Sequence, residues 1–188
     1  MCQLWVNLPK KHKMVKPNYQ PILKSQIPEV SLPLGAPSAD NDGENTVVGK
    51  ARIIAGELGD AKGAAKTFSP VQMWDVQLPH AGAEVDLPFP ENHNCIVFVR
   101  RGSVDVLSGN STEPKLKSSP LGAQDVALMR LDGSNTLRLR VKEPDTQIMI
   151  LGGEPINEPI AAQGPFVMNR PEEIRQAILD YQMGRMGK

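Results

Sequence analysis

The 188-residue chain is long enough for one domain with a substantial core, and its composition is that of an ordinary globular protein. Its 21 lysines and arginines balance 21 aspartates and glutamates, so no net field favours direct binding to nucleic acid. No apolar run approaches the roughly 20 residues of a membrane-spanning helix, and the apolar-then-basic order at the N-terminus is the reverse of a secretory signal. We therefore expect an intracellular protein, cytoplasmic or nuclear, that is not secreted and has no membrane partner.

Residues 3–8 form a strand-like apolar stretch near the N-terminus. Leu4 and Val6 share one face of this stretch, and Trp5 lies on the other. A short basic run follows, which consists of Lys10, Lys11, Lys13 and Lys16. We interpret these lysines as solvated surface, with a nuclear-localisation or phosphate-contacting patch as the alternative.

Residues 31–45 have no hydrophobic periodicity and are rich in turn formers, which predicts a flexible loop. Beyond this loop, seven segments are predicted to be strands: 50–57, 72–78, 95–99, 103–107, 125–131, 136–141 and 147–151. Within 136–141, Leu137, Leu139 and Val141 alternate with charged residues, which is typical of an antiparallel sheet with one wet face. The pattern predicts a β-sandwich or β-barrel over residues 46–168.

One helix is predicted at the C-terminal end, within residues 169–188. Asn169 is expected to cap the helix, Pro171 to occupy its first turn and Glu172 to complete the capping pattern. An apolar stripe follows at helical spacing, and it consists of Ile174, Ala177, Ile178 and Tyr181. This stripe is expected to dock on the barrel, and Gly184 is expected to end the helix.

Three groups of motifs extend over almost the whole chain. The first is residues 3–9 with the lysine-methionine, proline and tyrosine-glutamine motifs of 13–20, and the second is the Ala-Gly-Glu motif of 55–57. The third runs from 152–159 through 164–169 to Tyr181. Together they resemble the pirin family of the cupin superfamily, from the connection between its two cupin halves (here 1–30) to the end of the second half. The resemblance implies a mostly β fold, an antiparallel jelly-roll β-barrel of cupin type with one C-terminal α-helix.

The resemblance also implies where a cofactor lies. Pirins hold one iron ion in their first cupin half with three histidines and a glutamate, and the resemblance stops at Met1, so we expect that half to be absent from this chain. Members of the family are nuclear transcriptional cofactors in animals and quercetin dioxygenases in some bacteria. For this chain the expected cofactor is none, and no residue is assigned a catalytic role.

The chain's own cupin motif lacks the residue types that bind a metal. Metal-binding cupins have the pattern G-x5-H-x-H-x(3,4)-E-x6-G, and counting from Gly82 places Pro88 and Pro90 at the two histidine positions. Counting back from Gly102 places Cys95 at the glutamate position. Because a proline side chain has no donor atom, these positions cannot supply the two histidines and one carboxylate of an iron oxygenase site. We expect this half to bind no metal.

Two histidines and a cysteine are the alternative candidates for a metal site. His80 and His93 are thirteen residues apart and have no partner at the spacing of a typical ligand pair. We interpret both as turn or surface histidines, and Cys95 as a small buried residue rather than a nucleophile.

Arginines suggest a possible cationic face. Arg100 and Arg101 precede Gly102, and Arg138 and Arg140 alternate along one predicted strand. These side chains could attract an anionic partner, but we favour a solvent-facing strand edge whose charges prevent aggregation.

Two functions remain open from the sequence. The first is a metal-free cupin module that acts through a protein partner or self-association, with Leu4, Trp5 and Val6 as the candidate interface because apolar groups near a chain end require cover. The alternative is one part of an iron-dependent quercetin 2,3-dioxygenase whose metal-binding half is upstream or on another chain. A barrel that binds a small ligand without catalysis is a third, weaker option.

Overall fold

The computed structural model describes residues 3–34, 47–108, 117–129 and 135–187. The chain divides into two compact units, which are described separately: Ile22–Glu154, and Met1–Pro21 together with Pro155–Lys188. In the described residues, no helix is long and apolar enough to cross a membrane.

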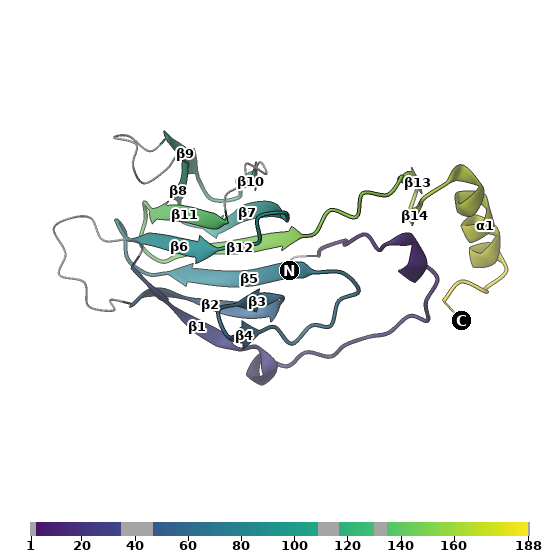
Figure 1. The fold of residues 1–188 in the computed structure, drawn as a ribbon, viewed down its shortest axis with the longest axis horizontal. Helices are drawn as coiled ribbons and strands as arrows, with labels where there is room; N and C mark the ends of the chain where they lie inside the picture. The colour runs from purple at the N-terminus through teal and green to yellow at the C-terminus, as the bar shows by residue number, and fades with distance from the viewer. Residues whose placement is uncertain (1–2, 35–46, 109–116, 130–134, 188) are drawn as a thin grey trace. The chain divides into compact units, whose positions relative to one another are not determined.

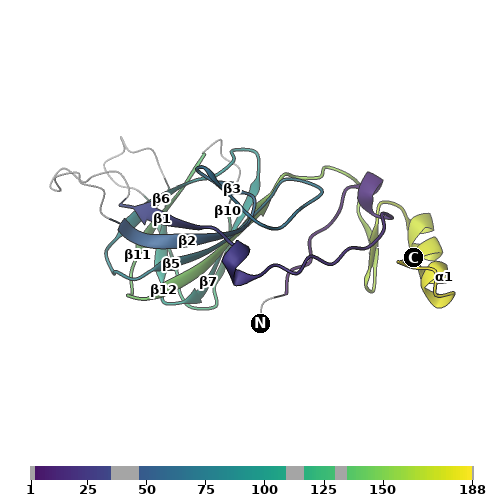
Figure 2. The same ribbon diagram turned by 90° about the horizontal axis from the view of Figure 1, so that it is seen from below.

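The larger unit contains a six-stranded antiparallel sheet whose strands lie in the order β1-β2-β5-β12-β7-β10. The strands are β1 (Glu29–Pro33), β2 (Val47–Ala55), β5 (Val71–Leu78), β12 (Thr146–Gly153), β7 (Asn94–Arg101) and β10 (Val126–Met129). Figure 2 shows β1, β2, β5, β12 and β7 running side by side. The central strands β2, β5, β12 and β7 are the longest of the six. Strand β7 carries three residues singled out in the sequence, Cys95, Arg100 and Arg101.

A second antiparallel sheet has four strands in the order β6-β11-β8-β9 (Figure 1). The strands are β6 (Glu84–Pro88), β11 (Thr136–Val141), β8 (Val104–Ser108) and β9 (Lys117–Leu121). A small separate hairpin is formed by β3 (Glu57–Leu58) and β4 (Ala61–Lys62), and a 3₁₀ turn, η2 (Lys24–Gln26), precedes β1.

The hydrophobic core lies where alternate side chains of the two sheets meet. In β11 the burial alternates along the strand, with Leu137, Leu139 and Val141 buried as their spacing predicts. Strands of the six-stranded sheet contribute the side chains with the least exposure, including Ile53, Trp74, Val97, Ile148 and Ile150. Burying this apolar surface is the main contribution that stabilises the sandwich.

The prediction of a mostly β, antiparallel fold with one α-helix is confirmed, but the closed barrel is wrong. Among the described strands, no hydrogen-bonded pairing joins the six-stranded sheet to the four-stranded one. The two sheets therefore form an open sandwich with edges at β1, β10, β6 and β9. Prolines lie at or near three of these edges (Pro33, Pro88 and Pro120), and because proline lacks an N–H group it does not continue a ladder.

All seven predicted strands correspond to strands of the structure, with boundaries shifted by a few residues. The prediction missed β1, β6 and β9 of the two sheets, which are short and contain charged residues or prolines. It also missed the two-residue strand β4 and the β13–β14 hairpin. Ser31 to Pro33, assigned to the predicted loop 31–45, belong to β1. Residues 35–45 of that loop, and the end of the predicted strand 125–131, lie outside the described residues.

The smaller unit contains η1 (Lys10–His12), the hairpin β13 (Ala161–Gln163) and β14 (Phe166–Met168), and α1 (Pro171–Gln182). The helix packs on the β13–β14 hairpin, and Ile174 and Ala177 of the predicted stripe are buried. Tyr181 is exposed, but its ring packs edge-on against Phe166 with centroids 5.9 Å apart. Gly184 follows the helix with φ of 63°, a conformation that glycine adopts without strain, so its role as the helix stop is confirmed.

The helix cap differs from the predicted one. Glu173, not Glu172, accepts hydrogen bonds from the N–H groups of Asn169 and Arg170, both at 3.0 Å. These bonds and the Lys10 side chain lower the pKa of the Glu173 carboxyl. The Asn169 side chain does not cap the helix, because its amide donates instead to Glu158 and to the carbonyl of Pro159.

Candidate functional site

The three degenerate cupin ligand positions lie at one end of the sandwich, between β6 and β7. Pro88 is the last residue of β6, Pro90 follows two residues later, and Cys95 is the second residue of β7. Phe89 lies between the two prolines and is buried, and its N–H donates to the carbonyl of Asn135 at 2.8 Å. At the positions where a metal-binding cupin carries imidazoles, this chain therefore carries two prolines and a buried aromatic ring.

Aromatic packing fills the space beside these positions. The ring of Phe89 contacts Trp74 edge-on with centroids 5.4 Å apart, and it lies 6.5 Å from the ring of His93. Gly152 of β12 faces the same ring so closely that a Cβ atom there would overlap Phe89. The glycine thus lets the aromatic ring pack against the backbone of β12.

Cys95 is buried, with 6% of its surface exposed. Desolvation raises the pKa of its thiol to about 12, so the thiol stays protonated near neutral pH. A protonated thiol does not act as a nucleophile.

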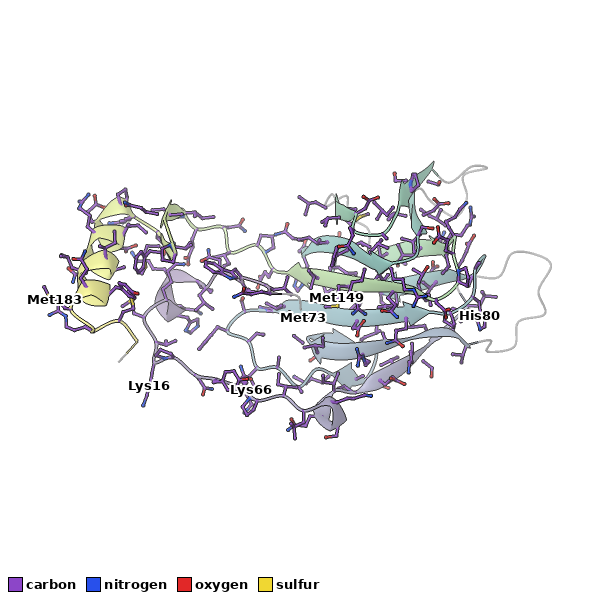
Figure 3. The ribbon with its side chains drawn as sticks, turned by 180° about the vertical axis from the view of Figure 1, so that it is seen from behind. Lys16, Lys66, Met73, His80, Met149 and Met183 are labelled. Carbon is purple, nitrogen blue, oxygen red and sulfur yellow. The ribbon has the colours of Figure 1, made fainter. Side chains whose placement is uncertain are left out.

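His80 and His93 lie at opposite ends of the sandwich. His80 follows the last residues of β5, as its label shows in Figure 3. His93 precedes Asn94, which pairs with Gly153 and through it with Val71 at the beginning of β5. Because β5 is eight residues long, and a strand rises about 3.3 Å per residue, the two imidazoles cannot share an ion.

His93 is a single imidazole without a set of ligands around it. Burial lowers the pKa of His93, and the nearby charge of Glu154 raises it by a smaller amount. Its Nδ1 is buried and has no hydrogen-bond partner among the described residues. In the part of the chain that the structure describes, no three His, Cys, Asp or Glu side chains are grouped so that they could hold a metal. The residues present do not fit the iron site that the fold family implies.

Arg100 is part of a charged cluster on the outer face of the six-stranded sheet. Its guanidinium and that of Arg52 both donate to the carboxylate of Asp75, one to each oxygen. The Asp75 side chain is 4% exposed, whereas the two arginines are about one-third exposed. Two cations therefore share one buried carboxylate, and the cluster keeps one positive charge.

Arg138 and Arg140 are placed on the outer face of the four-stranded sheet, where acidic side chains neutralise them. Arg138 makes two parallel hydrogen bonds to Asp86, at 2.7 and 2.8 Å, and Arg140 donates to Glu84 at 2.7 Å. The pairs lie directly across from each other in the β6–β11 register. The two arginines are paired with acidic side chains, so they do not form a cationic face. The predicted strand edge is wrong for them, because β11 lies between β6 and β8.

The candidate interface residues of the N-terminal segment are exposed to solvent. The exposed fractions of Leu4, Trp5 and Val6 are 39%, 73% and 55%. Two lysines of the basic run have partners within the smaller unit: Lys10 pairs with Glu173 at 3.4 Å, and Lys13 donates to Asn7 at 2.6 Å. That these residues bind a partner stays a prediction.

An apolar surface that was not predicted from the sequence lies on the outer face of the six-stranded sheet. We call it the outer patch. Its members are Val126 and Leu128, which are exposed, Met73, Ile96, Phe98 and Leu151, which are half-buried, and Met149, which is only 8% exposed. These side chains occupy the alternate positions opposite the core, and the register places Met149 beside Phe98 and Leu151 beside Ile96. Figure 3 shows Met73 and Met149 next to each other on β5 and β12. The signal was present in the sequence, because these strands carry apolar residues on both faces instead of alternating with polar ones.

The fold and this site define a cupin-type β-sandwich whose own ligand positions are occupied by residues that do not bind metal. Residues 73–187 match the Pirin C-terminal cupin domain. The chain is 41% identical over 185 residues to the Pseudomonas aeruginosa protein named "Putative quercetin 2,3-dioxygenase PA2418", and 30% identical over 186 residues to human Pirin; each match covers 98% of this chain and 56% of the relative. A solved structure of quercetin 2,3-dioxygenase from Acinetobacter baumannii superposes with a TM-score of 0.78 at 39% identity, again over 98% of this chain and 56% of that one. The chain belongs to the pirin family, as its motifs predicted, and it spans about half the length of the curated relatives it matches.

Proposed function

We propose that this chain is a non-catalytic cupin module of the pirin family that acts by binding a protein partner. The observation that carries the proposal is the set of residues at the cupin ligand positions. Pro88 and Pro90 have no donor atom, and Cys95 is held protonated by burial. The β-sandwich therefore provides surfaces rather than a reaction centre.

The surfaces of the larger unit support binding as the function. Soluble proteins usually bury large apolar side chains or scatter them singly, whereas the outer patch brings six partly or fully exposed ones together on adjacent strands. A patch of this kind beside partly exposed arginines is typical of an interaction surface, in which aromatic, methionine and arginine residues are enriched.

A second candidate function is one part of a quercetin 2,3-dioxygenase, with iron bound outside this chain. The specific observation in its favour is the naming of the relatives at 41% and 39% identity. In this case the module would support an iron-binding cupin half, and the chain alone would be inactive.

Metal analysis of the purified chain tests the first proposal. We expect iron well below one equivalent after incubation with ferrous iron without oxygen and removal of the excess, and no oxygen uptake with quercetin above the blank. The Acinetobacter baumannii quercetin 2,3-dioxygenase, treated in parallel, is the positive control. One iron per chain that is lost in both His93→Gln and Cys95→Ser would overturn the proposal.

Reconstitution separates the two candidates. The part of the Pseudomonas relative that lies outside the match can be produced as a separate chain and mixed with this one. Oxygen uptake with quercetin that requires both chains would establish the second function. Activity of the added part alone, unchanged by this chain, would exclude a supporting role.

A further inference from the structure

We propose that the open edge of β10, with the outer patch beside it, binds an extended apolar peptide segment with an acidic flank, contributed by a partner protein. This inference rests on the proposed interaction function, and it names the surface and the chemistry of the partner. In this mode of recognition the peptide adds a strand to the sheet, and its alternate side chains contact the face.

The four edges of the sandwich differ in how they resist pairing. The edges β1, β6 and β9 each contain a proline (Pro33, Pro88 and Pro120), and β1 and β6 also carry acidic side chains. The β10 sequence Val-Ala-Leu-Met contains neither proline nor charge. Among the described strands, β10 pairs only with β7, so its second edge has no partner there. Proteins usually block such an edge with lysine, proline or a covering segment, and β10 lacks the first two.

The side chains on this edge are apolar and open to solvent. Val126 and Leu128 are 62% and 72% exposed, and they face outward opposite Phe98 and Ile96 of β7. A strand added beside β10 would place every second side chain next to Val126 and Leu128. Apolar residues at those positions would extend the outer patch by one strand and would bury both side chains.

The charges at one end of β10 determine the preferred flank of the peptide. Beyond Phe98, β7 continues into Arg100 and the exposed Arg101, and Arg101 has no ion pair among the described residues. Arg100 shares the carboxylate of Asp75 with Arg52, which lies four strands away from β10 in the sheet. The carboxylate of Asp125, just before β10, accepts a hydrogen bond from the N–H of Gly122. The Nε atoms of Arg52 and Arg100 are buried without an acceptor among the described residues. The excess of positive charge favours a glutamate or aspartate on the bound segment.

Binding of labelled peptides tests the proposal. The probe is a fluorescein-labelled peptide of alternating valine and serine that begins with two glutamates, and the matched probes begin with two glutamines or two lysines. Fluorescence anisotropy should show the acidic peptide binding about fivefold or more tightly than the lysine peptide, the size expected for one partly screened charge contact. Arg101→Glu should reverse this preference. Leu128→Lys should weaken binding of the acidic peptide by about tenfold, because it places a charge on the apolar edge.

A control variant and the chain alone complete the test. Leu179→Lys changes an exposed leucine on α1 and should leave the affinity unchanged. The proposal is overturned if no peptide binds at millimolar concentration, if the three peptides bind equally, or if Leu128→Lys binds as the unaltered chain does. Sedimentation equilibrium tests whether a second copy of the chain binds the β10 edge instead. A dimer that Leu128→Lys dissociates would assign the edge to self-association and would overturn the proposal of a peptide partner. The metal analysis above is independent of these results, so the two proposals fail separately.

Discussion

The two outer faces of the sandwich follow the same alternation of inward and outward side chains, but they are composed differently. On the four-stranded sheet, Arg138 and Arg140 each lie opposite an acidic residue, and the charges are paired across the strands. On the six-stranded sheet, two arginines share the single carboxylate of Asp75, and most of the other outward side chains of the central strands are apolar. The arginines of the first face are each neutralised by an acidic side chain. The second face keeps one unpaired positive charge and leaves apolar side chains partly exposed to solvent.

This difference shows which feature of a β-sandwich points to function. Both faces pack equally well on the core, so burial of the inner side chains does not distinguish them. The difference lies in the pairing of the outward groups, because an exposed apolar surface of several adjacent side chains is uncommon in a protein that acts alone. The comparison can be tested by substitutions in the core between the two sheets, in the charge cluster on each outer face, and on the apolar edge strand β10.

The largest change in the free energy of unfolding is expected for a substitution in the core between the two sheets. Trp74→Ala removes a side chain with 0% exposure that contacts Phe89 edge-on, and it should lower the free energy of unfolding by about 3–5 kcal/mol. Phe98→Ala is the control on the outer face, where the ring is only half-buried, and it should cost about 1–2 kcal/mol. Urea denaturation followed by circular dichroism measures both values. Equal costs would show that the outer patch is packed as a core.

The next effect compares the two charge clusters. Asp75→Ala leaves two arginines without their shared carboxylate and should lower the free energy of unfolding by about 2–3 kcal/mol, since the arginines remain partly solvated. Asp86→Ala breaks a single pair whose members are both more accessible than Asp75, and it should cost about 1 kcal/mol. The same urea titrations report both differences. A larger cost for Asp86→Ala would contradict the distinction between the two faces.

A smaller effect is expected on the apolar edge. Leu128→Lys should change the free energy of unfolding by no more than about 0.5 kcal/mol, because the leucine is 72% exposed. The same substitution at Leu139, which is fully buried in β11, should prevent stable folding. Thermal melts of the two variants give the comparison. A Leu128→Lys variant that melts as poorly as Leu139→Lys would mean that the β10 edge is covered in the folded chain.

Much of the fold could be predicted from local patterns, and the failures have identifiable causes. The seven predicted strands are rich in apolar residues, and several alternate them with polar ones. In contrast, β6 carries Glu84 and Asp86 on its outer face and ends in a proline, so its sequence alone is typical of a loop. These acidic side chains are explained only by the pairing of β6 with β11, whose Arg138 and Arg140 lie opposite them. In the same way, the choice between Glu172 and Glu173 as the helix cap depends on where the chain enters α1, which spacing does not determine.

The candidate site was predictable where it depended on residue type, but not where it depended on pairing. Pro88 and Pro90 lack donor atoms whatever the fold, so the argument against metal coordination needed only the motif spacing. The outer patch arises from residues on four strands whose order along the sheet, β5-β12-β7-β10, does not follow the chain. No pattern within a single strand brings Met73, Phe98 and Leu128 together.

The smallest expected effect is the pH dependence of stability that His93 contributes at one end of the sandwich. Because burial lowers the pKa of His93 below its ordinary value of 6.5, the unfolded chain binds a proton there more readily than the folded one. The associated stability is fully present above pH 6.5 and is lost as the pH falls through the lowered pKa of the folded state. His93→Gln removes this dependence, so the free energy of unfolding of the variant should change less between pH 7 and pH 5. Urea midpoints measured in steps across this range, at constant ionic strength, provide the comparison. Parallel pH profiles would show that His93 is as well hydrated in the folded chain as in the unfolded one, and that Phe89 and Trp74 do not close this end of the sandwich around it.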